Sequence, residues 1–381
     1  MASRLEPVAP TKNPAGDRFG RYRLLDLIGK GGMAEVFLAV SHGIEGLQRT
    51  FVIKRIRPDR SDSPKFVQMF CDEARISALL HHPNIVQVYD FGQIDGAYFM
   101  VMEYLRGKDL ASVLRALRAQ RAAMPASLAA TIARDVARAL HHAHNALLPD
   151  GQPCAIVHRD VTPSNIMLLW AGGVKILDFG IAQAVERARP SGAAARNAGK
   201  LPRLQGKLAY LSPEQIRGAE VDRRSDLFSL GVVLWEMVAG QRLFAGADEF
   251  ETMRNVLMQP IAPPSRRRGS IPAGLDAVVT RALAREPERR YQTAEEMADD
   301  LDRLLLEMST AGQAIPNLLR HVFGRDPGAP RLATSSAPAT VAEMTTPSSL
   351  VVRSASRFPP FALVAAATVA LVAAIAAALL R

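Results

Sequence analysis

Cysteine is scarce in this chain: only Cys71 and Cys154 occur among its 381 residues. The two lie far apart in the sequence and have no partner pattern. This excludes both a disulfide framework and a zinc site built from cysteine thiolates. A reducing cytosol fits such a composition best.

Aromatic residues are also few, at 6% of the chain. The net charge of +10 would suit nucleic acid, but the aromatic fraction is low and no nucleic-acid-binding motif occurs. We therefore expect no nucleic-acid partner. The arginines cluster at residues 266–268, within 187–207 and beside the C-terminal apolar segment. Acidic peptides, anionic lipids and ordinary solvated surface are the alternatives for these clusters.

One long stretch, residues 361–380, lacks charge altogether. A helix of this length is about 30 Å long, the hydrocarbon thickness of a bilayer. We predict a single transmembrane helix there, with a buried helix of a soluble domain as the alternative. Residues 306–360 should form a juxtamembrane linker, because their Ala, Ser, Thr and Pro content from 331 onward cannot build a packed core. Two arginines shortly before the span and one after it place the preceding domain in the cytoplasm.

The rest of the chain divides by its hydrophobic periodicity. Residues 1–20 show little periodicity and are expected to be a flexible N-terminus. Strand patterns with one amphipathic helix at about 65–80 predict a small β-rich lobe over about residues 21–105. Helical patterns dominate from residue 110 and predict a larger helical lobe over about 106–305. The predicted fold class is α+β, with two lobes.

Two short polar runs carry the strongest chemical signal. Residues 158–165 read His-Arg-Asp-Val-Thr-Pro-Ser-Asn, and residues 178–180 read Asp-Phe-Gly. Asp160 and Asp178 are eighteen residues apart. Carboxylates and an amide in this order can accept a hydroxyl proton and hold magnesium ions beside a nucleotide.

These runs resemble the catalytic loop and metal-binding turn of eukaryotic-like protein kinases, and the chain is identified as a member of their bacterial Hanks-type serine/threonine branch over about residues 22–305. The resemblance implies ATP, Mg²⁺ or Mn²⁺, and protein substrates phosphorylated on Ser or Thr in bacterial signal transduction. Asp160 would accept the proton of the attacking hydroxyl, while Asn165 and Asp178 would hold the metal ions. With the predicted span, the kinase would be a single-pass protein of the bacterial inner membrane with its kinase domain in the cytoplasm.

The same resemblance implies where the phosphates of ATP would bind. A glycine-rich hairpin would bring backbone N–H groups to the phosphates, with a plain hairpin turn as the alternative. Its contacting residues would be Ile28, Gly29, Lys30, Gly31, Gly32 and Val36. Ala34 stands where a third glycine is usual. Lys54 would bind the phosphates and pair with Glu73, for which Asp72 is the rival.

The adenine base would meet the run at residues 100–105. Met102 would lie at the back of the adenine pocket, and the backbones of Glu103 and Leu105 would hydrogen-bond the base. Asp109 would either reach the ribose or cap the helix that starts near residue 110.

Three further features have expected structural roles. Residues 206–214 resemble the end of an activation segment, in which Glu214 would pair with Arg290. Asp226 would anchor the backbone of the catalytic loop. The histidines at 81–82 and 141–144 are expected to be structural, because no second group of ligands supports a metal site.

The chain departs from the family pattern at two positions. Kinases of this family usually carry lysine two residues after the catalytic aspartate and threonine after the glycine of the activation-segment end, but here these positions are Thr162 and Lys207. In the family the two side chains meet beside that aspartate. We therefore hypothesise that Lys207 is catalytic and delivers the missing ammonium group from the opposite wall.

Two other functions remain as alternatives. A pseudokinase scaffold that binds nucleotide or partners would explain Thr162, and a small-molecule phosphotransferase shares the kinase core. The retained Lys54, Asp160, Asn165 and Asp178 argue against the first. The peptide-docking segment ending at Glu214 argues against the second. Alanines spaced four apart in the predicted span suit a homodimer, although alanine richness explains the same spacing.

Overall fold

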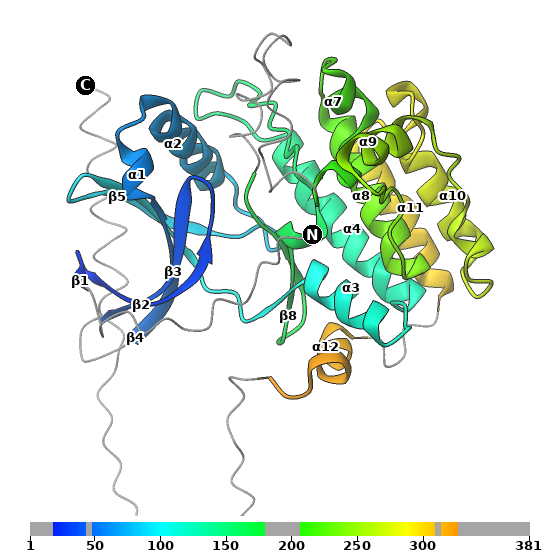
Figure 1. The fold of residues 1–381 in the computed structure, drawn as a ribbon, viewed down its shortest axis with the longest axis horizontal. Helices are drawn as coiled ribbons and strands as arrows, with labels where there is room; N and C mark the ends of the chain where they lie inside the picture. Colours follow the sequence, from blue (N-terminus) through cyan, green and yellow to red (C-terminus); the bar gives the residue numbers. More distant parts are fainter. Residues whose placement is uncertain (1–17, 43–47, 180–205, 309–313, 327–381) are drawn as a thin grey trace, which may run out of the picture. The chain divides into compact units, whose positions relative to one another are not determined.

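A computed structural model describes residues 18–42, 48–179, 206–308 and 314–326. The chain divides into a compact unit, Met1–Ala329, and a second unit, Pro330–Arg381, which lies outside the described residues. Within the first unit the expected two lobes are present, one of strands with the long helix α2 and one mostly of helices (Figure 1).

The smaller lobe is built on a six-stranded antiparallel sheet in the order β1-β2-β3-β4-β6-β5. Its elements are β1 (Arg18–Phe19), β2 (Tyr22–Lys30), β3 (Ala34–His42), β4 (Gln48–Ile56), α1 (Pro58–Ser61), α2 (Pro64–Leu79), β5 (Val88–Ile94) and β6 (Ala97–Glu103). Residues alternate between the two faces of each strand, so Tyr22, Phe37, Ile53 and Phe99 gather on one face as a buried cluster. On the other face, Phe70 of α2 packs in a second cluster with strand residues. The sheet therefore holds α2 in place.

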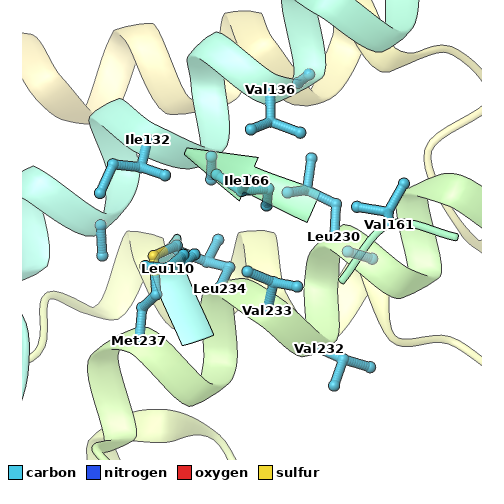
Figure 2. Close-up of a cluster of buried hydrophobic side chains, with 14 of the residues drawn as sticks. Leu110, Ile132, Val136, Val161, Ile166, Leu230, Val232, Val233, Leu234 and Met237 are labelled. Carbon is cyan, nitrogen blue, oxygen red and sulfur yellow. The ribbon is translucent and has the colours of Figure 1, made fainter. Parts of the chain in front are cut away.

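The larger lobe surrounds α8, which is buried at every position from Ser225 to Val238. A helix that is apolar all round must lie inside a helical bundle, and α4 and α10 both pack against it. Figure 2 shows Ile166 among side chains of α4 and α8, including Val136 and Leu230. The elements are β7 (Gly107–Asp109), α3 (Leu110–Ala119), α4 (Ala126–His144), β8 (Ile166–Leu169), β9 (Val174–Ile176), α7 (Pro213–Arg217), α8 (Arg223–Ala239), α9 (Glu249–Met258), α10 (Ala273–Ala282), α11 (Ala294–Glu307) and α12 (Ile315–Phe323).

The helix α12 corrects the expected extent of the juxtamembrane linker. Residues 306–360 were predicted to lack packed structure, but Ile315, Leu318 and Leu319 of α12 are buried against the helical lobe. The helix contacts α3 and β8, and Arg106 forms a 2.5 Å ion pair with Asp326 just beyond it. The prediction was wrong here because nine amphipathic residues suffice for a helix when a neighbouring lobe supplies the apolar surface.

No helix in the described ranges is both long and apolar enough to cross a membrane. The span predicted at residues 361–380 and the flexible N-terminus predicted at 1–20, apart from residues 18–20, lie outside the described residues.

Candidate active site

The catalytic loop places Asp160 and Asn165 against each other. The amide nitrogen of Asn165 donates to the backbone oxygen and to Oδ2 of Asp160, at 2.9 Å each. A short 3₁₀ turn at Pro163–Asn165 brings the amide back toward the carboxylate. Both hydrogen bonds use the side-chain nitrogen of Asn165, so the side-chain oxygen of Asn165 can bind a cation.

A buried carboxylate holds this loop in place. Asp226, at the start of α8, accepts hydrogen bonds from the backbone N–H groups of His158 and Arg159, at 2.8 Å each. His144 lies 2.8 Å from the same carboxylate. Burial alone would raise the pKa of Asp226, but the hydrogen bond and charge of His144, with contributions from His158, lower it below its ordinary value. The expected anchoring by Asp226 is confirmed, and His144 is a partner that the sequence did not predict.

Lys54 of β4 joins the two lobes. Its ammonium group forms a buried ion pair with Glu73 of α2 and lies 3.2 Å from Asp178 Oδ1. Burial would lower the pKa of Lys54, but the charges of Asp178 and Glu73 raise it above its ordinary value and keep the group positive. Asp72, the rival partner, instead contacts Gln68 and Arg75 at the surface. The structure thus selects Glu73.

Lys207 contacts the carboxylate of Asp160, the residue that Asn165 also contacts. Its Nζ lies 2.5 Å from Asp160 Oδ2. Thr162, where the family has lysine, is buried, and its hydroxyl shares a 2.9 Å hydrogen bond with Ser164. The ammonium group therefore arrives at Asp160 as the sequence hypothesis requires.

His158 supports the loop, and its ring Nδ1 accepts a 3.3 Å hydrogen bond from the backbone N–H of Asp160. Its ring packs at 4.7 Å, centre to centre, on Phe179, and Nε2 lies 2.9 Å from the backbone oxygen of Leu177. Leu177 and Phe179 lie on either side of Asp178, so these contacts hold the catalytic loop against the segment that carries Asp178. The expected scaffold role fits these contacts.

The strand that leads to the predicted adenine site ends at Glu103. Met102 is buried beside it. The N–H of Glu103 donates to Gln87 O at 3.0 Å, so a hydrogen bond from this residue to a base would use its carbonyl oxygen. Its carboxylate lies 2.5 Å from Lys175 Nζ in β9. The sequence did not predict this ion pair, for which Lys175 within an otherwise apolar strand was the only signal.

Asp109 has the capping geometry. Its two carboxylate oxygens accept from the backbone N–H and the hydroxyl of Ser112, at 2.8 and 2.7 Å. Asp109 thus caps the N-terminus of α3, and this role uses both of its carboxylate oxygens.

The glycine-rich tip is a hairpin between β2 and β3. Gly31 donates to the backbone oxygen of Ala34 at 2.7 Å, and a Cβ atom at Gly31 would lie 3.0 Å from that oxygen. A side chain there would crowd the turn. Lys30 lies 3.3 Å from Glu35 across the tip. Gly32 lies in the turn itself, whereas Gly29 lies near the end of β2, where it pairs with Val36 of β3. Ile28, also in β2, is exposed.

The end of the activation segment is bonded to the helical lobe. Glu214 and Arg290 form a buried bidentate ion pair at 2.6 and 2.7 Å, as expected. Burial raises the pKa of Glu214, but hydrogen bonds from Arg290 and Ser225 outweigh this effect and lower it. Gln215 donates to the backbone oxygen of Arg159 at 3.2 Å, which connects this segment to the catalytic loop.

Tyr210 takes part in a polar cluster that sequence reasoning missed. Its hydroxyl donates to Glu236 at 2.8 Å and accepts from Arg242 at 2.6 Å. Burial, followed by the charge of Glu236, raises the pKa of Tyr210 well above its ordinary value. A buried phenol with two partners is a structural group in this conformation.

The donor set fits magnesium held together with a nucleotide. Asp178 and the free amide oxygen of Asn165 are oxygen ligands, which Mg²⁺ prefers. Within the described ranges, no group of three or more His, Cys, Asp or Glu side chains could hold a metal ion by itself. Mg²⁺ commonly completes such a site with phosphate oxygens and water.

The comparisons with known proteins agree with this geometry. The family model for the protein kinase domain matches residues 22–301. Two similar curated proteins are tyrosine-protein kinase MasK of Myxococcus xanthus, 41% identical over 81% of this chain and 47% of its own length, and serine/threonine-protein kinase PknB of Mycobacterium leprae, 39% identical over 74% of this chain and 43% of its own length. The chain thus spans less than half the length of these relatives.

A solved structure gives the same result for the fold. The PknI kinase domain of Mycobacterium tuberculosis is 28% identical, covers 76% of this chain and 98% of its own, and superposes with a TM-score of 0.54. The family match, the relatives and the assembled site together show that the chain belongs to the protein kinase family, in its bacterial Hanks-type branch.

Proposed function

We propose that this protein is an ATP- and magnesium-dependent protein kinase that phosphorylates serine or threonine of other proteins in bacterial signalling. One observation carries the proposal: Lys54 contacts Glu73 and Asp178 at once, while Asn165 and Lys207 both contact Asp160. Phosphoryl transfer depends mainly on positioning and on neutralising charge, and these residues supply both.

Each residue has a task that its contacts support. Lys54 stays charged and is fixed by Glu73, so it can bind phosphate oxygens. Asp178 and Asn165 would hold magnesium, which neutralises charge on the phosphates when bound. Asp160 would orient the substrate hydroxyl and accept its proton, and Lys207 would stabilise the charge beside it. The Lys207 contact favours this reading over a pseudokinase, because the missing lysine has a replacement in place.

Acceptor specificity is part of the proposal. The printed names of the relatives differ, since MasK is called a tyrosine kinase and PknB a serine/threonine kinase. We favour serine and threonine because the catalytic loop resembles that branch.

The test is phosphate transfer from γ-labelled ATP by the full chain onto itself and onto a generic basic protein. We expect transfer that requires magnesium and yields phosphoserine or phosphothreonine on acid hydrolysis. Omitting magnesium, with a chelator present, is the control. Phosphotyrosine alone would contradict the acceptor assignment, and nucleotide binding without transfer would favour the pseudokinase.

We also propose that residues 361–380 anchor the protein in the bacterial inner membrane with the kinase domain in the cytoplasm. The support is the length of this uncharged run and the arginines before it. After cell fractionation, the full chain should remain with membranes through a carbonate wash, whereas a Leu371→Arg/Ile375→Arg variant should be largely released, because arginines near a span's centre are costly. Equal retention of both forms would contradict the anchor.

A further inference from the structure

The arginines at 266–268 have no part in the proposed phosphoryl transfer. The structure brings two of them, Arg267 and Arg268, together with Arg118 and Arg121 around one pocket of about 390 Å³. We call it the arginine pocket. Its other lining residues are small and uncharged: Ala122, Ala123, Ala239 and Gly240.

Three chain segments form the arginine pocket. Arg118 lies in the last turn of α3, and Arg121 follows it with a positive φ of 52°. Gly240 ends α8 with a φ of 71°, and a Cβ atom there would lie 3.0 Å from Ala123 Cβ. The small residues thus let the backbone segments approach closely. The third segment follows the 3₁₀ turn at Pro264–Arg266, where Arg268 donates to Met124 O at 3.3 Å.

The charge of the arginine pocket is poorly balanced. Among the residues that the structure describes, no acidic one lines it. The Arg118 Nη1 atom is buried and has no hydrogen-bond partner in the described structure. It lies 3.9 Å from Glu236, whose carboxylate already accepts hydrogen bonds from Tyr210 and from the N–H of Leu243. A buried donor left unpaired is costly, so an acceptor that entered the pocket would be favoured.

The two outer arginines are free to bind. Both Arg121 and Arg267 are exposed, and neither side chain makes a hydrogen bond or ion pair with any described residue. Guanidinium groups bind phosphate oxygens in a bidentate manner. Four of them around a concave site match a ligand with several negative charges better than a single chloride or carboxylate.

We propose that the arginine pocket binds a small anion that carries two or more phosphate groups. The volume lies at the lower end of small-molecule pockets, which suits a compact oligophosphate. The residues are separate from Lys54, Asp178 and Asn165, so this site is distinct from the proposed nucleotide site. A soluble oligophosphate and a phosphorylated lipid headgroup share this chemistry.

The experiment measures binding of sodium tripolyphosphate to the full chain by isothermal titration calorimetry, in magnesium-free buffer of low ionic strength. The test variant is Arg121→Gln/Arg267→Gln, which removes two exposed charges of the pocket. The matched control is Arg266→Gln, because this exposed arginine lies next to Arg267 but does not line the pocket. Melting temperatures establish that each variant is folded.

We expect the double variant to weaken tripolyphosphate binding by about tenfold or more, and the control to change it less than about twofold. Unchanged binding in the double variant would overturn the proposal. An equal loss in the Arg266→Gln variant would also overturn it, because the effect would then be one of overall charge. Competition with water-soluble dihexanoyl diacylglycerol pyrophosphate, whose headgroup carries two phosphates, separates the two sources of this chemistry. Displacement of tripolyphosphate assigns the pocket to a lipid headgroup, and no displacement assigns it to a soluble ligand.

Discussion

Replacing Asp160 by asparagine should lower phosphate transfer by about 10²- to 10⁴-fold, the usual contribution of a general base. The amide keeps the size of the carboxylate but accepts a proton poorly. It also gives up the charge that faces Lys207 Nζ at 2.5 Å. The measurement is the initial rate of transfer from γ-labelled ATP by the full chain, at saturating ATP and magnesium.

Nucleotide affinity should change little in this variant, because Lys54, Glu73 and Asp178 remain in contact. The matched control is Asp72→Asn, which removes a carboxylate from the exposed side of α2, where Asp72 contacts Arg75. Exposed ion pairs contribute little, so its rate should stay within about twofold of wild type. An Asp160→Asn variant that keeps more than a third of the wild-type rate would refute the assigned role.

The second large effect concerns the exchange of Thr162 and Lys207. Lys207→Thr should lower the catalytic rate by about 10²-fold, the cost of removing one charge-stabilising group from a catalytic site. The reverse single change, Thr162→Lys, should be milder, although it places a second ammonium group near Asp160 and must fit a site where Thr162 is buried. The double variant restores the usual family arrangement and should recover most of the rate.

These four proteins form a double-mutant cycle, in which the coupling between the positions is measured directly. A rate for the double variant at least tenfold above that of Lys207→Thr would show that one ammonium group can be supplied from either wall. Near-normal activity of Lys207→Thr would show that the contact has no catalytic part. A double variant as slow as Lys207→Thr would show that the two positions are not interchangeable.

The sequence predicted the parts of the site that depend on short, fixed spacings. Asp160 and Asn165 meet within a single loop, so five residues determine their geometry. The ion pair of Glu214 with Arg290 spans 76 residues and was predicted only through the family resemblance. By contrast, the contacts of Tyr210 with Arg242 and of Glu103 with Lys175 depend on how separate elements pack. No local pattern identifies the partner in either pair, although a lysine in an apolar strand indicates that Lys175 has one.

The helix α12 was missed for a related reason. Its apolar residues resemble many short amphipathic stretches that remain unfolded in isolation, because a helix of nine residues is marginal in water. Only the apolar surface offered by α3 and β8 makes it stable, and that surface exists only after the lobe has folded. The strands of the small lobe were easier to predict, because alternating apolar and polar residues indicated them directly.

The anchoring of the catalytic loop by Asp226 has a consequence for how activity is acquired. The two hydrogen bonds to His158 and Arg159 close loops of 68 and 67 residues, and the contact with His144 spans 82. Such non-local contacts are entropically costly to close and exist only when α8 is packed beside the loop. We therefore expect the catalytic loop to lose its geometry, and the protein its activity, when the packing of α8 is lost.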